Sequence, residues 1–473
     1  MSPLQNVDVL VPPVERVEAF VEWDRLVEAG RRAQRVLDGR TLWTISSTRH
    51  GGVAEMLFSV VAHSVSAGVD LRWVQADGDP AFSLVGKRLH HRLSGDPGDG
   101  GPLGSAEHAV FAATSATNAH ALAMVVKPGD LIILNGPRVA GMAPLLRDTG
   151  ALVLWRLRVG ADPRNDAARQ AWAFLLPYLD DAHAFQFTDW DVVPPELADR
   201  RVSVIQPAID ISMEKNVPMG PPQVASVLRA AGIIDGQSDA VPILTPHDGR
   251  VSAVTCRARM IQDEPIQFTD PLVVQIARWD ALKDPVGVIQ AFAAHIAPAV
   301  PDARLVLAGP SPDLVSDDPE GSGVLADATA ARAACDEPVR RRIHLASLPA
   351  DERMESAAMV NALQRHASVV VQKSLAEGFG LAAAEAMWKR RPVVASRVGG
   401  LRSLIDDGVN GILVDDPTDL AGFGTAVVAL LEDPRRADAL GDGAHERVRA
   451  QFLFSRYLQQ MVQAFSRILD QDA

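Results

Sequence analysis

Short apolar runs, many of them rich in β-branched residues, recur through the second half of the chain and alternate with longer amphipathic segments. The runs cover residues 272–278, 303–309, 342–348, 367–374, 391–396 and 411–416. Between most of them lie segments with the residue spacing of helices, such as those that start at Pro285 and Arg353. Apolar runs that alternate with amphipathic helices predict a parallel sheet covered by helices.

The first half of the chain repeats this pattern less regularly. Its apolar runs cover residues 41–48, 69–76, 131–135, 151–158, 183–188 and 201–207, and a helix-like segment follows the first run from Val53. Residues 217–269, with many prolines and little periodicity, separate the halves and predict a linker with flanking loops. The sequence therefore predicts two α/β domains, over residues 1–240 and 265–450, which suits a chain of 473 residues.

Composition and charge narrow the classes of partner. Hydrophobic residues make up 47% of the chain, charged residues make up 22%, and the formal net charge is −13. This acidic balance argues against nucleic acid or an anionic membrane surface as the main partner. We find neither an apolar stretch of the ~20 residues that a transmembrane helix needs nor a signal-peptide pattern at the start. Cys256 and Cys335 lie far apart, so we expect isolated thiols and a cytoplasmic location.

A glycine corner separates two glutamates, Glu377 and Glu385, in the sequence EGFGLAAAE. The corner lies between the predicted strand 367–374 and a helix predicted from Leu381. Ligands of open α/β sheets bind at the carboxyl ends of strands, where glycine lets the backbone approach and free N–H groups attract anions. The two carboxylates could therefore contact hydroxyl-bearing parts of a ligand whose phosphates lie near the helix start. Alternatively, Glu385 could cap the helix or form an ion pair on its surface.

Two cations follow the first predicted strand of the second domain. Arg278 and Lys283 lie in the segment RWDALK directly after that strand. Two cations at a strand end, in an acidic protein, suit a pyrophosphate group. Each of them alone would be an ordinary surface charge.

Several stretches in order along the chain resemble one enzyme family. They cover residues 51–57, 155–165, 205–216, 278–289, 317–321, 360–381 and 384–394. The chain resembles the retaining GT-B glycosyltransferases of family 4, which carry an E-x7-E motif, and most closely the trehalose synthases of the glycosyltransferring type and the related trehalose phosphorylases. The resemblance implies two Rossmann-like domains that face each other across a cleft, with a C-terminal helix, about 452–473, packed back on the first domain. It also suggests a homodimer.

The resemblance implies a donor site mostly in the second domain, occupied by a nucleotide diphosphate sugar. Arg278 and Lys283 would neutralise the diphosphate, and Glu385 would hold the ribose hydroxyls. Glu377 would contact the hexose. The remaining donor contacts would come from Gly378, Phe379, Gly380 and Leu381 at the corner and from Gly51 and Gly52 in the first domain, where the family usually has three glycines and this chain has His50-Gly51-Gly52.

Such enzymes retain the anomeric configuration without a committed protein nucleophile. Arg278, Lys283 and Glu377 are then the expected catalytic residues, and catalysis rests on positioning and on charge stabilisation. The fold requires no metal or other cofactor. In this context the triplet from Asp189 to Asp191, which has DxD spacing, is better interpreted as a surface loop than as a metal motif.

The departures from the family cluster at sugar-facing positions of the first domain. The chain reads NGPRV over residues 135–139, with Asn135 and Arg138, where the family has HDPQP, and Arg158 replaces a family histidine. Leu404 replaces a glutamine. Arginine and leucine cannot reproduce the hydrogen bonds of histidine and glutamine. A modified donor or acceptor, such as a deoxy sugar, an amino sugar or a cyclitol, is one explanation, and neutral drift around an unchanged reaction is the other.

Three functions compete at this stage. The leading hypothesis is a nucleotide-sugar-dependent transferase that makes an α-linked disaccharide or pseudo-disaccharide from a small sugar-type acceptor. The second is a phosphorylase that uses inorganic phosphate in the same cationic pocket. The third is a non-catalytic protein that binds a sugar nucleotide. The combination of Arg278, Lys283, Glu377 and Glu385 favours an enzyme.

Overall fold

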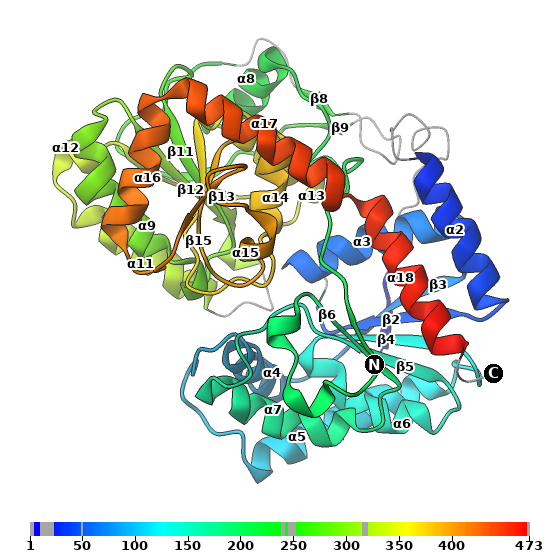
Figure 1. Cartoon of the computed structure of the whole chain (residues 1–473). Coiled ribbons are helices and arrows are strands. Elements are labelled where there is room, and N and C mark those ends of the chain that lie inside the picture. Colours follow the sequence, from blue (N-terminus) through cyan, green and yellow to red (C-terminus); the bar gives the residue numbers. More distant parts are fainter. Residues whose placement is uncertain are drawn as a thin grey trace. The chain divides into compact units, whose positions relative to one another are not determined.

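The chain forms two compact units in a computed structural model that describes residues 4–9, 23–48, 51–237, 242–244, 252–314 and 320–470. The first unit comprises Met1–Ala208 and Phe454–Ala473, and the second comprises Ile209–Leu453. Figure 1 traces both units along the sequence. Each unit is built on a sheet of seven strands, which confirms the predicted organisation into two α/β domains.

The sheet of the first unit has the strand order β1-β3-β2-β4-β5-β6-β7. Its strands are β1 (Leu4–Asn6), β2 (Leu42–Ser46), β3 (Leu71–Ala76), β4 (Leu131–Asn135), β5 (Leu152–Arg156), β6 (Ala184–Phe187) and β7 (Val202–Val204). All pairs are parallel except that of β1 with β3. The short antiparallel edge strand β1 was not predicted.

Helices cover both faces of this sheet (Figure 1). The helices on one face are α4 (Pro80–Leu93), α5 (Ser105–Ala123), α6 (Ala143–Arg147) and α7 (Asp166–Leu179), and those on the other are α2 (Trp23–Leu37), α3 (Gly51–Ser66) and α18 (Phe454–Leu469). Side chains alternate between the two faces along β2. Trp43 and Ile45 pack against the helices α4 to α7, whereas Leu42 and Thr44 face α2, α3 and α18.

The sheet of the second unit has the order β10-β13-β12-β11-β14-β15-β16. Its strands are β10 (Arg259–Ile261), β11 (Leu272–Ile276), β12 (Arg304–Pro310), β13 (Ile343–Leu348), β14 (Val369–Gln372), β15 (Val393–Ser396) and β16 (Ile412–Val414). Only the pair of β10 with β13 is antiparallel. Every strand predicted for this half of the chain is present.

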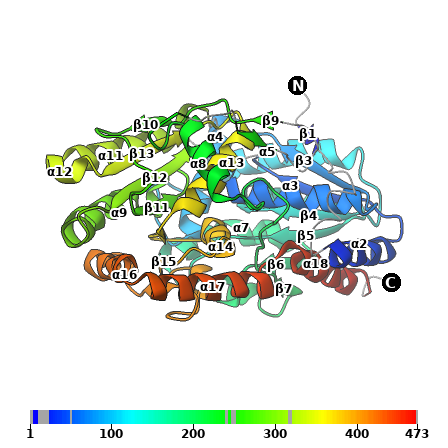
Figure 2. The ribbon, with the colours of Figure 1, turned by 90° about the horizontal axis from the view of Figure 1, so that it is seen from above.

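Two core layers lie on the two faces of this second sheet, as the view in Figure 2 illustrates. One layer includes α9 (Pro285–Ala291), α11 (Gly321–Ala333), α16 (Leu420–Glu432) and the π-helical turn η5 (Phe292–Ile296), and the other includes α8 (Pro221–Ala230), α13 (Arg353–His366), α14 (Leu381–Trp388) and α17 (Pro434–Gln451). The short helices α10 (Ala297–Ala299), α12 (Glu337–Arg340) and α15 (Leu401–Leu404) complete the unit. Successive residues of β11 alternate between the layers, with Val273 in the first and Val274 in the second.

The division between the units differs from the predicted boundaries. Residues 209–240 belong to the second unit rather than to the first, because α8 packs against α13. The stretch 217–269 was predicted as linker and loops. This is wrong for strand β10 and for α8, whose Val224, Val227 and Leu228 are buried. Their helical spacing after Pro221 and Pro222 was a signal available in the sequence. The structure groups α18 with the first unit, where it packs against α2.

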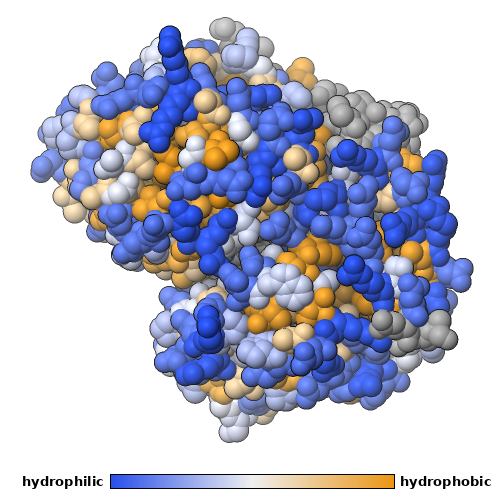
Figure 3. Space-filling view, in the orientation of Figure 1, coloured by the Kyte–Doolittle hydropathy of each residue, from blue (hydrophilic) through white to orange (hydrophobic). Residues whose placement is uncertain are grey.

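The surface is predominantly hydrophilic on the face drawn in Figure 3, with hydrophobic residues in small patches. Within the described ranges, none of the helices combines the length and the apolar composition needed to cross a membrane.

A buried histidine lies near the amino end of β13. His344 has no exposed surface, and its Nδ1 lies 3.2 Å from Oε1 of Gln262. Its buried Nε2 has no hydrogen-bond partner among the described residues. Burial, reinforced by Arg304 and Arg332, lowers the pKa of His344 to about 3. The imidazole is therefore neutral in the folded protein at neutral pH.

We expect His344 to make the folded protein sensitive to acid. The unfolded chain binds a proton at this residue near its ordinary pKa of 6.5, so stability is fully present above that pH and declines as pH falls toward the folded pKa. At pH 5 the loss in the free energy of unfolding should be about 2 kcal/mol. Urea unfolding at pH 7.5 and pH 5 measures it.

The control for this experiment is a pair of variants. His344→Gln should remove that part of the pH dependence, whereas substitution of the exposed His120 by glutamine should leave it unchanged. Equal acid sensitivity in both variants would contradict the assignment to His344.

Candidate functional site

The second sheet has a topological switch point between β11 and β14. From β11 the chain continues to β12 on one side, whereas β14 pairs with β11 on the other side. In open α/β sheets the crevice beyond the carboxyl ends at such a point is where ligands bind. The segments that follow β11 and β14 here contain Arg278, Lys283 and Glu377, three of the residues predicted from the sequence.

One buried amide fixes the spacing of these two segments. Gln275, on β11, donates from Nε2 to the carbonyl of Lys283 (2.8 Å) and accepts at Oε1 from the backbone N–H of Lys373 (3.0 Å). The N–H of Leu375 donates to the carbonyl of Leu282 (2.8 Å). The two loops are therefore joined by one direct backbone hydrogen bond and through the side chain of Gln275.

The side chains of Lys283 and Glu377 meet at this point. Lys283 Nζ donates to Oε2 of Glu377 at 2.7 Å, and Gln372 Nε2 and Ser374 Oγ donate to the same oxygen at 3.1 and 3.3 Å. The side chains of Lys283 and Glu377 are only 17% and 11% exposed. Three donors hold one carboxylate oxygen, so the position of Glu377 is fixed.

Arg278 lies on the same loop but closer to solvent. Its Nη2 contacts Oδ2 of Asp280 at 3.0 Å, and its side chain is 43% exposed. Asp280 also caps the 3₁₀ turn η4 (Ala281–Lys283) by accepting from the N–H of Leu282 at 2.9 Å. The loop thus presents two cations, each next to a carboxylate.

A second lysine, Lys373, contacts the end of the loop that follows β11. Sequence reasoning missed this lysine. Lys373 is 1% exposed, and its Nζ pairs with Asp284 and donates to the carbonyl of Pro417 at 2.8 Å. Asp284 has a φ of 47° and caps α9 through the N–H of Gly287. Burial of Lys373 was not visible in the sequence, because its partners come from distant segments.

The glycine corner packs directly against a second glycine turn. Gly380 has a φ of 94° and precedes α14. Gly399, with a φ of 47°, lies so close to the corner that a Cβ there would stand 1.7 Å from the carbonyl oxygen of Glu377. A Cβ on Gly400 would lie 2.5 Å from the Cα of Phe379. Only glycine fits at these two positions, where the backbone of residues 399–400 packs directly against the backbone of residues 377–379.

Glu385 is buried, not on the helix surface, and lies one turn from a buried lysine. Glu385 is 6% exposed and Lys389 is 4% exposed. Lys389 Nζ donates to Oε1 of Gln364 (2.7 Å), Oδ1 of Asn216 (3.1 Å) and the carbonyl of Glu385 (3.1 Å). Burial lowers the pKa of Lys389 to about 7, against an opposing effect of Glu385. Sequence reasoning missed Lys389, although its spacing of four residues from Glu385 was a signal.

The first unit places its candidates at the carboxyl edge of its own sheet. Asn135 ends β4 and is buried, and its Nδ2 donates to Thr44 Oγ1 and to the carbonyl of Ile45, both at 2.9 Å. Arg138 follows in the 3₁₀ turn η1 (Pro137–Met142), where its side chain lies against Gly86 of α4. Arg158 follows β5.

The remaining predicted positions are as follows. Gly51 and Gly52 begin α3, and His50 and residues 317–319 lie outside the described residues. Leu404 is buried in the core of the second unit. Asp189 and Asp191 lie at the 3₁₀ turn η2 (Trp190–Val192), where Asp189 accepts from the N–H of Asp191 at 3.0 Å. The described residues contain no group of three His, Cys, Asp or Glu side chains that could hold a metal ion.

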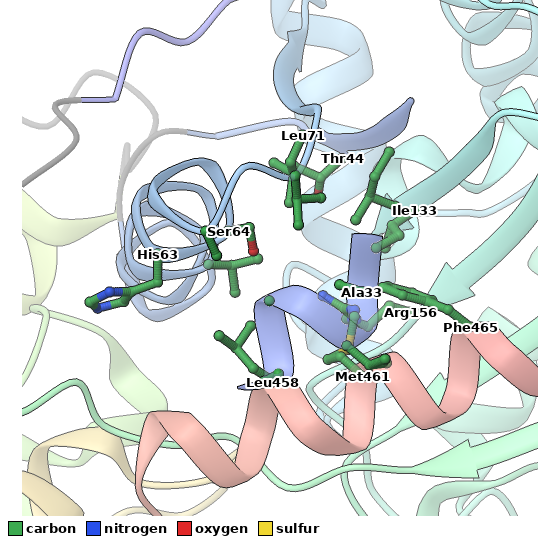
Figure 4. Close-up of a pocket in the computed structure, with 17 residues that line it drawn as sticks. Ala33, Thr44, His63, Ser64, Leu71, Ile133, Arg156, Leu458, Met461 and Phe465 are labelled. Atoms are coloured by element: carbon green, nitrogen blue, oxygen red, sulfur yellow. The ribbon is translucent and has the colours of Figure 1, made fainter. Parts of the chain in front are cut away.

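An apolar cavity in the first unit is too small to hold a sugar. Its volume is about 30 Å³, and it lies between α2, α3, α18 and the sheet. Figure 4 shows its lining, with Ala33 from α2, Ser64 from α3, and Leu458 and Phe465 from α18. A space of this size holds about one water molecule, so we interpret it as a packing gap beneath α18.

Comparisons with solved structures define the class of this fold. The UDP-forming α,α-trehalose-phosphate synthase of Burkholderia vietnamiensis has a TM-score of 0.65 at 14% identity, over 92% of this chain and 98% of the other. Sucrose-phosphate synthase from Thermosynechococcus elongatus has a TM-score of 0.61 at 18% identity, over 92% and 100%. The fold is that of the GT-B glycosyltransferases, as predicted.

Sequence comparisons define the family. A model for the N-terminal domain of trehalose synthase matches residues 44–194, and a model for group 1 glycosyl transferases matches residues 257–447. The trehalose synthase of Rubrobacter xylanophilus is 30% identical over 443 residues, 92% of each chain. That of Pyrococcus horikoshii is 27% identical over 447 residues, 94% of each chain. The chain belongs to the trehalose synthase family of glycosyltransferases.

We expect Gly399→Ala to disrupt the corner. The new Cβ would overlap the carbonyl oxygen of Glu377, so the loop that carries Glu377 must move. The free energy of unfolding should fall by about 2 kcal/mol or more, measured by urea unfolding.

Gly408→Ala is the matched control. Gly408 also has a positive φ, of 74°, but a Cβ there would meet nothing within 4 Å. Its cost should be limited to backbone strain, about 1 kcal/mol. Equal losses in the two variants would show that the contact with Glu377 is unimportant.

Proposed function

We propose that this protein is a retaining glycosyltransferase that moves a sugar, or a sugar-like cyclitol, from a nucleotide diphosphate donor to a small sugar-type acceptor. The observation that carries the proposal is the meeting of Lys283 and Glu377 at the switch point of the second sheet, at 2.7 Å. A fixed cation and a fixed carboxylate at one crevice suit a ligand with a charged end and a hydroxyl-rich end. Membership of the trehalose synthase family supports the same conclusion.

The diphosphate is proposed to lie near Lys283, Arg278 and the start of α14. Both cations project from the loop after β11, and the corner at Gly380 leaves the first N–H groups of α14 without partners inside the helix. Such N–H groups and nearby cations together favour an anion. A solved structure that is described as bound with UDP-2-fluoro glucose shares the fold, with a TM-score of 0.65, which supports a nucleotide sugar as the donor.

The two glutamates take different parts of the donor in this proposal. Glu377, held by Lys283 and Gln372, accepts hydrogen bonds from hydroxyl groups of the transferred sugar. Glu385, one turn into α14, accepts from the ribose hydroxyls.

Transfer requires no protein nucleophile. The bond between the anomeric carbon and the diphosphate oxygen breaks while the acceptor hydroxyl oxygen bonds to that carbon on the same face. The hydroxyl proton passes to an oxygen of the leaving diphosphate. Lys283 and Arg278 stabilise the charge that develops on the leaving group, and this charge stabilisation is the protein's main contribution to the rate.

We expect Lys283→Ala and Arg278→Ala to weaken the binding of nucleoside diphosphates. The loss of one charge-assisted hydrogen bond should cost ~1.5–3 kcal/mol of binding free energy. Titration calorimetry with UDP, ADP and GDP measures it, with Arg390→Ala, which removes an exposed arginine paired with Asp442, as the control. Unchanged affinity in both Lys283→Ala and Arg278→Ala would refute the proposed pocket.

We expect Glu385→Gln to weaken nucleotide binding more than it weakens the fold. The substitution keeps the shape of the side chain but turns one acceptor oxygen into a donor, so one ribose hydrogen bond is lost, at ~1–3 kcal/mol. Calorimetry and thermal unfolding measured on one preparation separate the two effects. A large drop in Tm with normal nucleotide affinity would instead make Glu385 a structural partner of Lys389.

A further inference from the structure

Two arginines lie together at the carboxyl end of β5 without a carboxylate partner in the described part of the chain. Arg156 is the last residue of β5, and Arg158 follows two residues later. The hydrogen bonds of the two guanidinium groups within the described residues go to uncharged side chains. Those of Arg156 go to Asn135, Gln186 and Met461, and those of Arg158 go to Met56 and Tyr457.

Arg156 supplies a fixed positive charge from inside the unit. It is 1% exposed, and its guanidinium donates to Gln186 Oε1 (3.1 Å), Asn135 Oδ1 (3.3 Å) and the thioether sulfur of Met461 (2.9 Å). Burial, with a smaller contribution from the nearby Arg158, lowers the pKa of Arg156 to about 10. Arg156 therefore remains charged at neutral pH, and its interaction with Arg158 is repulsive.

Arg158 is half-buried and incompletely satisfied by its own neighbours. Its Nη2 donates to the hydroxyl of Tyr457 at 2.9 Å, and its Nη1 contacts the sulfur of Met56 at 2.7 Å. A guanidinium carries five N–H donors, and a thioether is a weak acceptor. The contacts within the described residues therefore leave most of this donor capacity for another acceptor.

The two arginines also affect the pKa of the Tyr457 hydroxyl. Burial alone would raise the pKa of this side chain. Arg156 and Arg158, with smaller contributions from Gln186 and Arg456, instead hold the pKa below its usual value. Tyr457 is 1% exposed and fixed on α18. It holds the Arg158 guanidinium in one orientation without neutralising it.

We propose that Arg158 is an anion-binding residue and that the acceptor carries a phosphate or carboxylate group. Such a group would take the place of the Met56 sulfur and accept two parallel N–H bonds from the guanidinium. It would also relieve the repulsion between Arg158 and Arg156. The proposal rests on the proposed function only in treating this ligand as the acceptor.

The competing explanation is purely structural. Arg156 contacts Met461 and Arg158 contacts Tyr457, one helical turn apart on α18. The two arginines could serve only to fasten α18 to the sheet. In that case Arg158 would affect stability and no ligand.

Ligand binding to the full chain separates the two explanations. Glucose, glucose 6-phosphate, glucuronate and inorganic phosphate are titrated at low salt, with and without a nucleoside diphosphate. We expect at least one of the two anionic sugars to bind roughly tenfold or more tightly than glucose and than inorganic phosphate. Which of them binds identifies the anionic group.

The variants assign the effect to Arg158. Arg158→Gln should weaken binding of the anionic sugar by roughly 10- to 100-fold, and Arg158→Lys should recover part of this loss because it keeps the charge. Arg164→Gln is the matched control, because Arg164 lies in the loop after β5 with its side chain 86% exposed. Unchanged binding in Arg158→Gln, or glucose binding as tightly as both anionic sugars, would overturn the proposal, and a lowered Tm alone would assign Arg158 to α18.

Nucleotide binding in the same preparations distinguishes this failure from failure of the proposed function. If nucleoside diphosphates bind and neither anionic sugar does, the anionic acceptor is wrong and the donor site stands. If the anionic sugar binds through Arg158 while no nucleoside diphosphate binds, the anion site stands and the proposed donor is wrong.

Discussion

The ion pair between Lys283 and Glu377 is the contact on which the organisation of the second unit's crevice depends. It joins the loops after two neighbouring parallel strands at the point where the strand order reverses. Gln275 fixes the spacing between the two loops, and Gly399, which lacks a Cβ, leaves room for the backbone of Glu377. These residues together hold a largely buried carboxylate against a largely buried ammonium group.

The carboxyl edges of the two sheets differ in how they balance charge. In the second unit, Lys283, Arg278 and Lys373 each have a carboxylate neighbour. In the first unit, Arg156 and Arg158 have amide, hydroxyl and thioether neighbours within the described residues. The cations are therefore paired with carboxylates at the second edge, and within the described residues they are not at the first.

Much of this architecture could be predicted from the sequence, because strands buried on both faces of a parallel sheet consist of continuous apolar runs. The apolar run from Leu272 predicted strand β11 and the loop after it, which contains Arg278 and Lys283. The sequence EGFG predicted the glycine corner. What could not be predicted depends on contacts between distant segments. The burial of Lys373 requires Asp284 and Pro417, and that of Lys389 requires Asn216 and Gln364. In the sequence, both lysines look like ordinary surface charges next to a strand or a helix.

The first unit is assembled from both ends of the chain, whereas the second is one continuous segment. Helix α18 packs against α2, although more than four hundred residues separate them in the sequence. During synthesis from the N-terminus, the second unit can therefore complete its core before the last helix of the first unit leaves the ribosome. Until then, the apolar surface of the sheet, α2 and α3 that packs against Leu458, Met461 and Phe465 lacks the cover of α18. Completing the core of the first unit therefore requires the closure of a loop that contains the whole second unit, and this closure has an entropic cost.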